Sequence, residues 1–238
     1  MNKMNKKYEL TKETKTMDNG DIVYRIRAIR EFMTLCGRKV NPGDLGGCVS
    51  SERNLSHEGT CWLFGDAVNS GNSRRYDNSV GYDSAWSFED SIQYENSQQF
   101  GNSRQFGKSE QSGNSVQYEN SEQYENSRQF GNSRQYGNSA QSGNSRQFGS
   151  SRQYGNSLQS GNSLQSGNSR QFGSSRQYGN SRQSGNSLQS GNSRQSGNSE
   201  QYEESRQYGN SRQYGNSRQY GNSRQFGSSR QCGESEVY

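Results

Sequence analysis

The sequence has little apolar character for its 238 residues. Only 24% of the residues are hydrophobic, the mean hydropathy is −1.38, and there is a single proline. Such a composition commonly predicts disorder, because too little apolar surface is available to offset the chain entropy lost on folding. No run approaches the roughly 18 apolar residues of a membrane span. The opening residues, MNKMNKKYEL, are followed by no apolar run, so no signal peptide is expected.

Residues that carry chemistry are also scarce. His57 is the only histidine, and it precedes the repeats with no base or orienting partner beside it in the sequence, which favours a structural role. The four cysteines, Cys36, Cys48, Cys61 and Cys232, include no CxxC pair and match neither a zinc site nor a disulfide framework. We therefore expect no catalytic residue, no metal, no cofactor and no enzymatic activity. A reducing, cytoplasmic location is the default expectation, and a phage-encoded protein or one exported by a non-classical route is the alternative.

The chain contains a six-residue repeat that runs from Cys61 to Tyr238 without insertion or deletion. Counted from Ser91, position 1 is Ser in all 25 units, and position 3 is Gln from Gln93 to Gln231. Position 2 varies and is Arg in 14 units, position 4 is Tyr or Phe in 17, and positions 5 and 6 are mostly Gly-Asn. A disordered tract has no reason to keep such a frame, so the repeat predicts an ordered solenoid.

Each unit fits a short strand followed by a corner, because six is a multiple of two and not of 3.6. Gly-Asn is suited to the corner, since both residues tolerate positive φ. Burying positions 2 and 4 would place an unpaired Arg or Glu inside most units, at a cost of several kcal/mol each. Ser and Gln are therefore predicted to face inward.

A polar interior of this kind can satisfy itself by stacking. At a coil spacing of about 4.8 Å, each Gln amide can donate to the next Gln and accept from the previous one, and Ser hydroxyls can bond to each other or to the backbone. The predicted structural core ladder comprises Ser91, Gln93, Ser109, Gln111, Ser127, Gln129, Ser145, Gln147, Ser163, Gln165, Ser181, Gln183, Ser199, Gln201, Ser217 and Gln219.

At these residues the chain resembles the left-handed parallel β-helix of the hexapeptide-repeat superfamily, with Gln in the aliphatic place and Ser in the small one. The segments KYELT, IRAIREF, GDLGG and NLSHEGTCWLFGDA resemble gut-bacterial and phage solenoid proteins with GNA-type repeats, often described as polymer-forming. The resemblance implies an all-β parallel β-solenoid with three units, or 18 residues, per coil and about 10 coils. A flatter coil of two units is the alternative.

The chain divides by composition into three parts. Residues 1–60 have globular patterning and are predicted to cap the solenoid, with strands at Tyr8–Thr11 and Ile22–Ile29 around the turn MDNGD. Within this module, Arg30–Leu35 is either a short helix or a strand, and NPGDLGG is a loop. Residues 61–90 are transitional first coils with apolar positions, and residues 91–238 form the regular solenoid.

Arg at position 2 and the aromatic at position 4 form the best candidate binding feature, since both are predicted to face outward. In an 18-residue coil, one face would carry a possible interaction stripe of Arg134, Tyr136, Arg152, Tyr154, Arg170, Phe172, Arg206, Tyr208, Arg224 and Phe226. These side chains either ladder along the solenoid and pack against another copy, or bind a foreign ligand such as single-stranded nucleic acid or a sugar.

The distribution of charge also suggests association. Residues 61–126 carry ten acidic and four basic side chains, whereas residues 127–198 carry eight arginines and no acid. The strand edge at Val237 and Tyr238 is a possible end-to-end contact.

We therefore predict a structural protein whose main partner is a second copy of itself, in a homo-oligomer or filament. A scaffold for an anionic polymer, glycan or surface is the second hypothesis. An acyltransferase like those of the hexapeptide superfamily is a distant third, because His57 lies outside the repeats.

Overall fold

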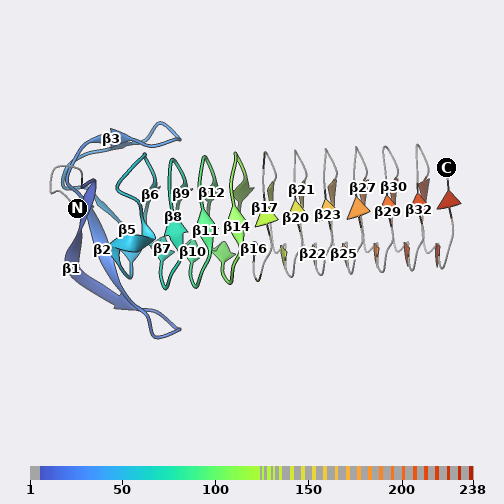
Figure 1. Ribbon diagram of the computed structural model, residues 1–238, viewed down its shortest axis with the longest axis horizontal. Helices are drawn as coiled ribbons and strands as arrows, with labels where there is room; N and C mark the ends of the chain where they lie inside the picture. The colour runs from blue at the N-terminus through green and yellow to red at the C-terminus, as the bar shows by residue number, and fades with distance from the viewer. Residues whose placement is uncertain are drawn as a thin grey trace. The chain divides into compact units, whose positions relative to one another are not determined.

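The computed structural model describes residues 6–123 continuously and, beyond them, Glu125, Gly131 and the two-residue strands from Arg128–Gln129 to Glu236–Val237. The chain separates into two compact units, Met1–Glu119 and Asn120–Tyr238. Figure 1 shows the order of the strands along the chain.

The first unit begins with a small antiparallel arrangement. β1 (Tyr8–Thr16) pairs with β2 (Ile22–Ala28), and β2 pairs with β5 (Leu45–Val49). β3 (Phe32–Met33) and β4 (Lys39–Val40) form a separate short hairpin. A single 3₁₀ turn, η2 (Glu52–Asn54), then leads into the coils, with Ser51 as its N-cap in a capping box.

Ten two-residue strands form the coils of the first unit. Within this unit, strands 18 residues apart pair in parallel, so β6, β9, β12 and β15 form one sheet, β8, β11 and β14 a second, and β7, β10 and β13 a third that β5 joins. The strands are β6 Trp62–Leu63, β7 Val68–Asn69, β8 Arg74–Arg75, β9 Val80–Gly81, β10 Trp86–Ser87, β11 Ile92–Gln93, β12 Gln98–Gln99, β13 Arg104–Gln105, β14 Glu110–Gln111 and β15 Val116–Gln117.

In the described corners from Gly65 to Gly131, the residue at position 5 has left-handed backbone. Gly65, Gly71 and Gly101 have φ of 61°, 61° and 66°, which glycine adopts without strain. This single left-handed residue turns the chain after every two-residue strand, so the six-residue spacing follows from corner geometry.

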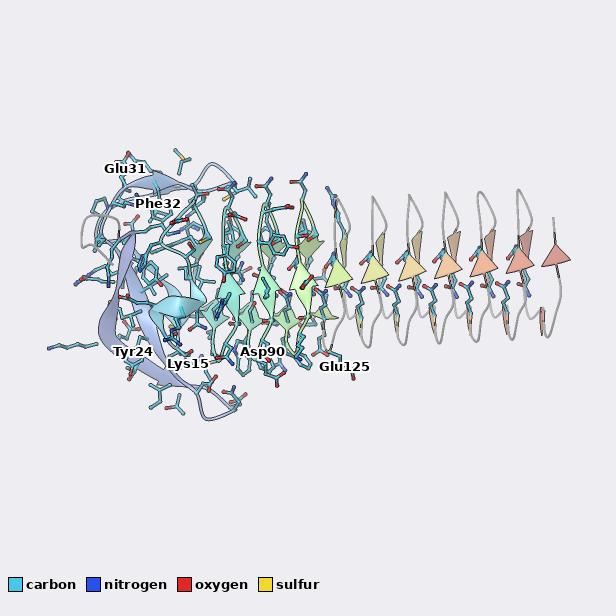
Figure 2. All side chains as sticks on the ribbon, in the orientation of Figure 1. Lys15, Tyr24, Glu31, Phe32, Asp90 and Glu125 are labelled. Carbon is cyan, nitrogen blue, oxygen red and sulfur yellow. The ribbon has the colours of Figure 1, made fainter. Side chains whose placement is uncertain are left out.

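The interior of the first unit changes from apolar to polar along the chain. Tyr8, Ile26, Val49, Trp62 and Leu63 belong to one buried cluster that joins the N-terminal strands to the first coil. Phe32 on β3 packs edge-on against Trp62 at 5.3 Å between ring centroids, and Figure 2 labels its position. The N-terminal strands therefore cap the first coil with a conventional hydrophobic core.

The second unit repeats the coil pattern in three parallel sheets with the same 18-residue register. Its strands are β16 Glu122–Gln123, β17 Arg128–Gln129, β18 Arg134–Gln135, β19 Ala140–Gln141, β20 Arg146–Gln147, β21 Arg152–Gln153, β22 Leu158–Gln159, β23 Leu164–Gln165, β24 Arg170–Gln171, β25 Arg176–Gln177, β26 Arg182–Gln183, β27 Leu188–Gln189, β28 Arg194–Gln195, β29 Glu200–Gln201, β30 Arg206–Gln207, β31 Arg212–Gln213, β32 Arg218–Gln219, β33 Arg224–Gln225, β34 Arg230–Gln231 and β35 Glu236–Val237.

The predicted all-β parallel β-solenoid is confirmed, as are the N-terminal hairpin and the three repeats per coil. The segment expected to be a helix or strand forms β3, and the loop expected at NPGDLGG is shorter than predicted, because Leu45 already begins β5. The boundaries at residues 60 and 90 stay predictions, as does left-handedness.

Candidate functional site

The inward-facing polar side chains are the most regular feature of the molecule. Gln93, Gln111, Gln129, Gln147, Gln165, Gln183, Gln201 and Gln219 are all 0–1% exposed, and Ser91 and Ser109 are equally buried. The predicted polar interior is therefore confirmed. Ser127, Ser145, Ser163, Ser181, Ser199 and Ser217 lie outside the described residues.

Each unit contains a glutamine ladder along one of its sheets. In the first unit, Gln99 Nε2 donates to Gln117 Oε1 at 3.0 Å. In the second, Gln135 donates to Gln153 and Gln153 to Gln171, both at 3.1 Å. These bonds all point toward the C-terminus, and Gln153 both accepts from Gln135 and donates to Gln171, as the repeat predicted. On another sheet the prediction is not met, since the Oε1 atoms of Gln93 and Gln147 have no hydrogen-bond partner in the described part of the chain.

On the other sheets, glutamines also use the backbone. Gln105 Nε2 donates to the carbonyl oxygens of Ile92 and Ser109, both at 3.2 Å. Gln111 makes the equivalent pair of bonds one repeat later, at 3.1 and 3.2 Å. Gln93 instead donates to Gln105 Oε1 across the interior at 2.5 Å and to Gln111 Oε1 at 3.3 Å. Glutamines of the repeat therefore use two kinds of acceptor, another glutamine or a backbone carbonyl, and Gln93 and Gln111 differ although they lie on the same sheet.

The buried serines fall into two groups: Ser73 and Ser79 donate to the carbonyl oxygens of Ser87 and Tyr76, at 3.1 and 2.8 Å, whereas the serines described in the following coils do not bond in this way. Among the described residues, the Oγ atoms of Ser91, Ser97, Ser103, Ser109, Ser115 and Ser121 have no hydrogen-bond partner. The expected hydroxyl bonds are therefore absent at these six positions. Two serine hydroxyls stacked about 4.8 Å apart cannot bond to each other, because a hydrogen bond needs about 2.8 Å. An amide spans that gap because its donor and acceptor lie on opposite sides of a planar group.

Arg75 occupies the interior position that Gln holds in later coils. Its side chain is 1% exposed, and Nη2 donates to Gln99 Oε1 at 3.0 Å and to Asn69 Oδ1 at 3.5 Å. Its Nε and Nη1 have no partner among the described residues. Burial lowers the pKa of Arg75 to about 9. Sequence reasoning missed this buried cation, although Gly81 in the next unit signals the space that it fills.

The aromatic residues at position 4 form columns of stacked rings in the first unit. In one column, Phe64, Tyr82, Phe100 and Tyr118 follow one another at centroid distances of 5.0, 4.6 and 4.9 Å, with interplanar angles of 12°, 2° and 8°. Arg38 from the β3–β4 hairpin covers the free face of Phe64 at 4.2 Å. Neighbouring aromatics thus cover the ring faces inside this column.

The predicted interaction stripe has the same 18-residue spacing as this column. Arg134 is exposed, as predicted for position 2. The strands containing Arg152, Arg170, Arg206 and Arg224 are described, but their side chains are not. Tyr136, Tyr154, Phe172, Tyr208 and Phe226 lie outside the described residues, as does Tyr238, and only the strand position of Val237 is described.

Acidic residues replace Gly at several corners. Asp77, Asp83, Glu89 and Glu95 have φ between 53° and 58°, a strained region for such side chains. Each carboxylate accepts the backbone N–H of the residue one coil later, as Glu95 Oε2 does from Gly113 at 2.6 Å. These acids are structural links between coils, a role that the sequence did not reveal.

A second amide column follows the corner asparagines. Thr60 Oγ1 donates to Asn78 at 2.8 Å, Asn78 to Asn96 at 3.2 Å and Asn96 to Asn114 at 3.1 Å. Asn72 Nδ2 donates to Asp90, a corner residue labelled in Figure 2. The corner residues Asn72, Asn78, Asn96 and Asn114 therefore link successive coils in addition to favouring the turn.

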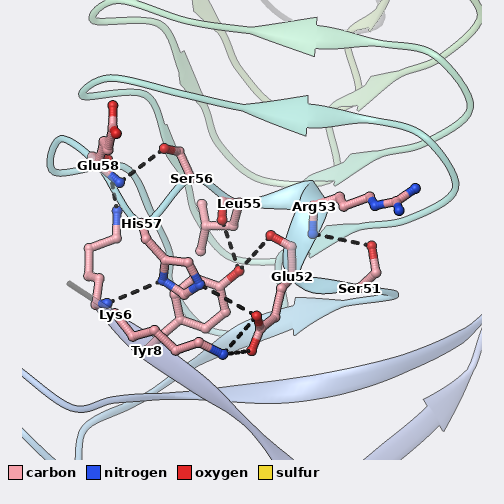
Figure 3. A network of polar contacts seen from close by, with 10 residues as sticks. Lys6, Tyr8, Ser51, Glu52, Arg53, Leu55, Ser56, His57 and Glu58 are labelled. Atoms are coloured by element: carbon pink, nitrogen blue, oxygen red, sulfur yellow. Dashed lines mark hydrogen bonds and ion pairs between the residues drawn. The ribbon is translucent and has the colours of Figure 1, made fainter. Parts of the chain in front are cut away.

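His57 lies in a polar network beneath the N-terminal strand (Figure 3). Its Nδ1 accepts the Lys7 backbone N–H at 3.2 Å, its ring stacks on Tyr8 at 4.4 Å, and its Nε2 lies 3.8 Å from Glu52 Oε2. Lys6 Nζ donates to the same carboxylate at 2.6 Å. Burial is the main cause that lowers the pKa of His57, while the hydrogen bond from Lys6 lowers the pKa of Glu52. The network fastens the cap, since each member bonds to another element of it.

Three cysteines lie in the described region, and all three are free: Cys36 is exposed, whereas Cys48 and Cys61 are buried. Cys232 lies outside it. Over the described ranges, no group of three or more His, Cys, Asp or Glu residues has the arrangement of a metal site. No helix in the described part of the chain has the length and apolar character required to cross a membrane.

The comparisons with known proteins assign no family. No protein-family model matches this sequence. No curated protein matches it either.

Proposed function

We propose that this chain is a non-enzymatic structural protein that self-associates into a filament or another higher-order assembly. The observation that carries the proposal is the exact 18-residue pairing of the described strands, together with side-chain ladders that keep the same register. Each coil offers the next one the same backbone and amide groups. Such an element extends by repetition and builds length, as structural solenoids do.

The aromatic column supports a structural role more than the binding of a base or a sugar. Bases and sugars bind aromatic side chains through ring faces, but the faces of Tyr82 and Phe100 are occupied by neighbouring rings at 4.6–5.0 Å. Ring edges remain available for contact with a second copy. Lateral association through position 4 therefore agrees with the geometry better than nucleic-acid stacking does.

We also propose that the solenoid is a left-handed β-helix of the hexapeptide-repeat type, related to the phage and gut-bacterial GNA-repeat proteins. The six-residue unit and the three units per coil support this assignment. An experimental structure with a right-handed path would contradict it.

The experiment for self-association is negative-stain electron microscopy of the purified full chain, combined with sedimentation velocity over a hundredfold range of concentration. Both should be done at low and high salt. Fibres, or species that grow with concentration, are the expected result. Monomers at every concentration and at both salt levels would contradict the proposal.

A scaffold for polyanions is the second candidate, favoured by the exposed Arg104 and Arg134 and by the 14 arginines at position 2. Heparin or an oligonucleotide should then bind with an affinity that falls steeply with salt. Acyltransferase activity has less support, because His57 is engaged by the Lys7 backbone and stacked on Tyr8. An acyl transfer abolished by His57→Ala would favour that third hypothesis.

A further inference from the structure

Lys7 is a buried lysine, and the proposed structural function of the chain gives its amine no role. Its side chain is 0% exposed, immediately before β1, and Nζ donates to Cys61 O at 2.8 Å and Glu58 O at 3.4 Å. Within the part of the chain that the structure describes, no carboxylate lies within ion-pair distance of this amine. A buried cation without a counter-ion is costly, and burial accordingly lowers the pKa of this amine, although carbonyl oxygens and the Phe32 ring, 5.4 Å from Nζ, offset part of the cost.

The thiol of Cys61 lies against this amine. Cys61 is 0% exposed and free, and its Sγ is 3.2 Å from Lys7 Nζ. The other contacts of Sγ are longer ones to carbonyl oxygens, with Ser56 at 3.4 Å and Arg75 at 3.7 Å. The nitrogen and sulfur atoms are therefore already at the separation of about 3–3.5 Å that characterises reacting groups.

The surroundings of Lys7 favour loss of a proton from its amine. Burial lowers the pKa of the Lys7 amine, and the nearby Arg30 guanidinium lowers it further, while Cys61 opposes both effects. A neutral amine retains the lone pair that attack on an oxidised sulfur requires.

We propose that Lys7 and Cys61 form an oxidative cross-link, in which a direct S–N bond joins the start of β1 to the first coil. Hydrogen peroxide first oxidises the thiol: R–SH and H₂O₂ give R–SOH and H₂O. The Lys7 nitrogen then attacks the sulfur, hydroxide leaves and takes a proton from nitrogen as water, and R–S–NH–R′ remains. Sulfur is oxidised by two electrons, peroxide is reduced, and the chain loses two hydrogen atoms overall.

Access to the buried thiol requires a brief opening of the cap. β1 pairs with β2 alone and so lies at the edge of its sheet, where a strand opens more readily than in the middle. Peroxide reaches Cys61 while the cap is open, and reclosure returns Lys7 to the sulfur. The exposed Cys36 should consequently be oxidised before the cross-link appears.

The bond would fasten the N-terminal strand to the solenoid across 54 residues of sequence. A covalent link across such a loop restricts the unfolded chain and slows detachment of the cap. This inference goes beyond the proposed function and does not depend on self-association.

The test treats the purified full chain with dilute hydrogen peroxide under native conditions and then cleaves it after glutamate. This cleavage places Lys7 in the peptide of residues 1–9 and Cys61 in that of residues 59–89. We expect a linked peptide about 2 Da lighter than the sum of the two, with fragmentation that assigns the bond to Lys7, and its loss on treatment with dithiothreitol.

Two variants serve as matched controls. Lys7→Arg keeps donors for the carbonyls of Cys61 and Glu58 but lacks a nucleophilic amine, so it should give no linked peptide. Cys61→Ser should give none either, while the exposed Cys36 in both variants still reports oxidation. Circular dichroism establishes that each variant is folded.

Two results would overturn the proposal. One is a wild-type chain in which Cys36 is fully oxidised and no Lys7–Cys61 peptide forms. The other is Cys61 carrying two or three oxygen atoms beside an unmodified Lys7.

Discussion

Arg75 donates from Nη2 to Gln99 Oε1 at 3.0 Å, at the point where the interior changes from apolar to polar. Gln99 in turn donates to Gln117, so Arg75 supplies a donor for the first acceptor of this ladder in the first unit. Gly81 leaves room for the guanidinium, since a Cβ there would lie 3.2 Å from Nη2. The arginine therefore joins two kinds of core and replaces the glutamine that later coils use.

The first prediction separates the size of Arg75 from its charge. Arg75→Ala should lower the free energy of unfolding by about 2–4 kcal/mol, because it leaves a cavity in the interior. Arg75→Met fills that space and removes a buried charge with two unpartnered nitrogens, so we expect a denaturation midpoint equal to or above that of the wild type. Gln99 Oε1 keeps its donor Ser87 Oγ at 2.9 Å in both variants. A methionine variant as unstable as the alanine variant would show that the guanidinium itself is required.

The second prediction compares two adjacent residues of β18. Gln135→Ala deletes a buried amide and leaves Gln153 Oε1 without its donor, so it should cost about 3 kcal/mol. Arg134 is exposed, and Arg134→Ala should cost less than about 0.5 kcal/mol. Urea denaturation followed by circular dichroism measures both. Equal midpoints would refute the assignment of the ladder as a stabilising element.

The sequence predicted the solenoid because the repeat is strict enough to reveal both strand period and corner. The invariant Ser and Gln, set against a variable position 2, identified which side chains face inward. That inference needed only the cost of burying charge, which is the same in every coil. The 18-residue coil came from resemblance, and the register of β12 with β15 confirms it.

Other features could not be predicted because they depend on relations between coils. In the sequence, Glu95 is indistinguishable from a solvated corner residue. Its hydrogen bond from Gly113 N–H becomes evident only when the next coil is placed beside it. Arg75 stands at position 3 of its unit, which predicts an inward side chain, but the cost of burying charge argues against an arginine there, and only the structure confirms the space beside Gly81 that it fills. The contacts of His57 require residues about 50 positions away, namely Lys7 and Tyr8.

The third prediction concerns the strained corner at Glu95, which has φ of 56°. Glu95→Ala keeps the left-handed backbone and loses the acceptor for Gly113 N–H, so it should cost about 1–2 kcal/mol. Glu95→Gly loses the same bond but relieves the strain, worth about 1 kcal/mol. Glycine should therefore be the more stable variant by thermal unfolding. A thermal midpoint for the alanine variant equal to or above that of the glycine variant would show that this corner is not strained.

The fourth prediction is a pH dependence of the cap that comes from His57. Its folded pKa lies below the ordinary value of 6.5, so between those two values the unfolded chain binds more protons and stability rises with pH. Acidification through this window should therefore destabilise the cap, by up to about 1 kcal/mol for each pH unit. Protonation would remove the Nδ1 acceptor of the Lys7 N–H and place a cation near Lys6 and Arg30. Glu52, 3.8 Å away, opposes this loss in part.

The matched variant is His57→Asn, whose Oδ1 can take the place of Nδ1 but does not titrate. Thermal midpoints measured from pH 7 to pH 5 should fall further for the wild type than for this variant. The folded pKa of Glu52 lies below 4.5, so its stabilising contribution is lost only under more acidic conditions and does not enter the comparison. Parallel curves for the two proteins would mean that His57 is not the titrating group. Exchange of a backbone amide hydrogen is catalysed by base and slows as the pH falls from 7 to 5. If the Lys7 amide slows less than this, the loss of stability is located at the cap.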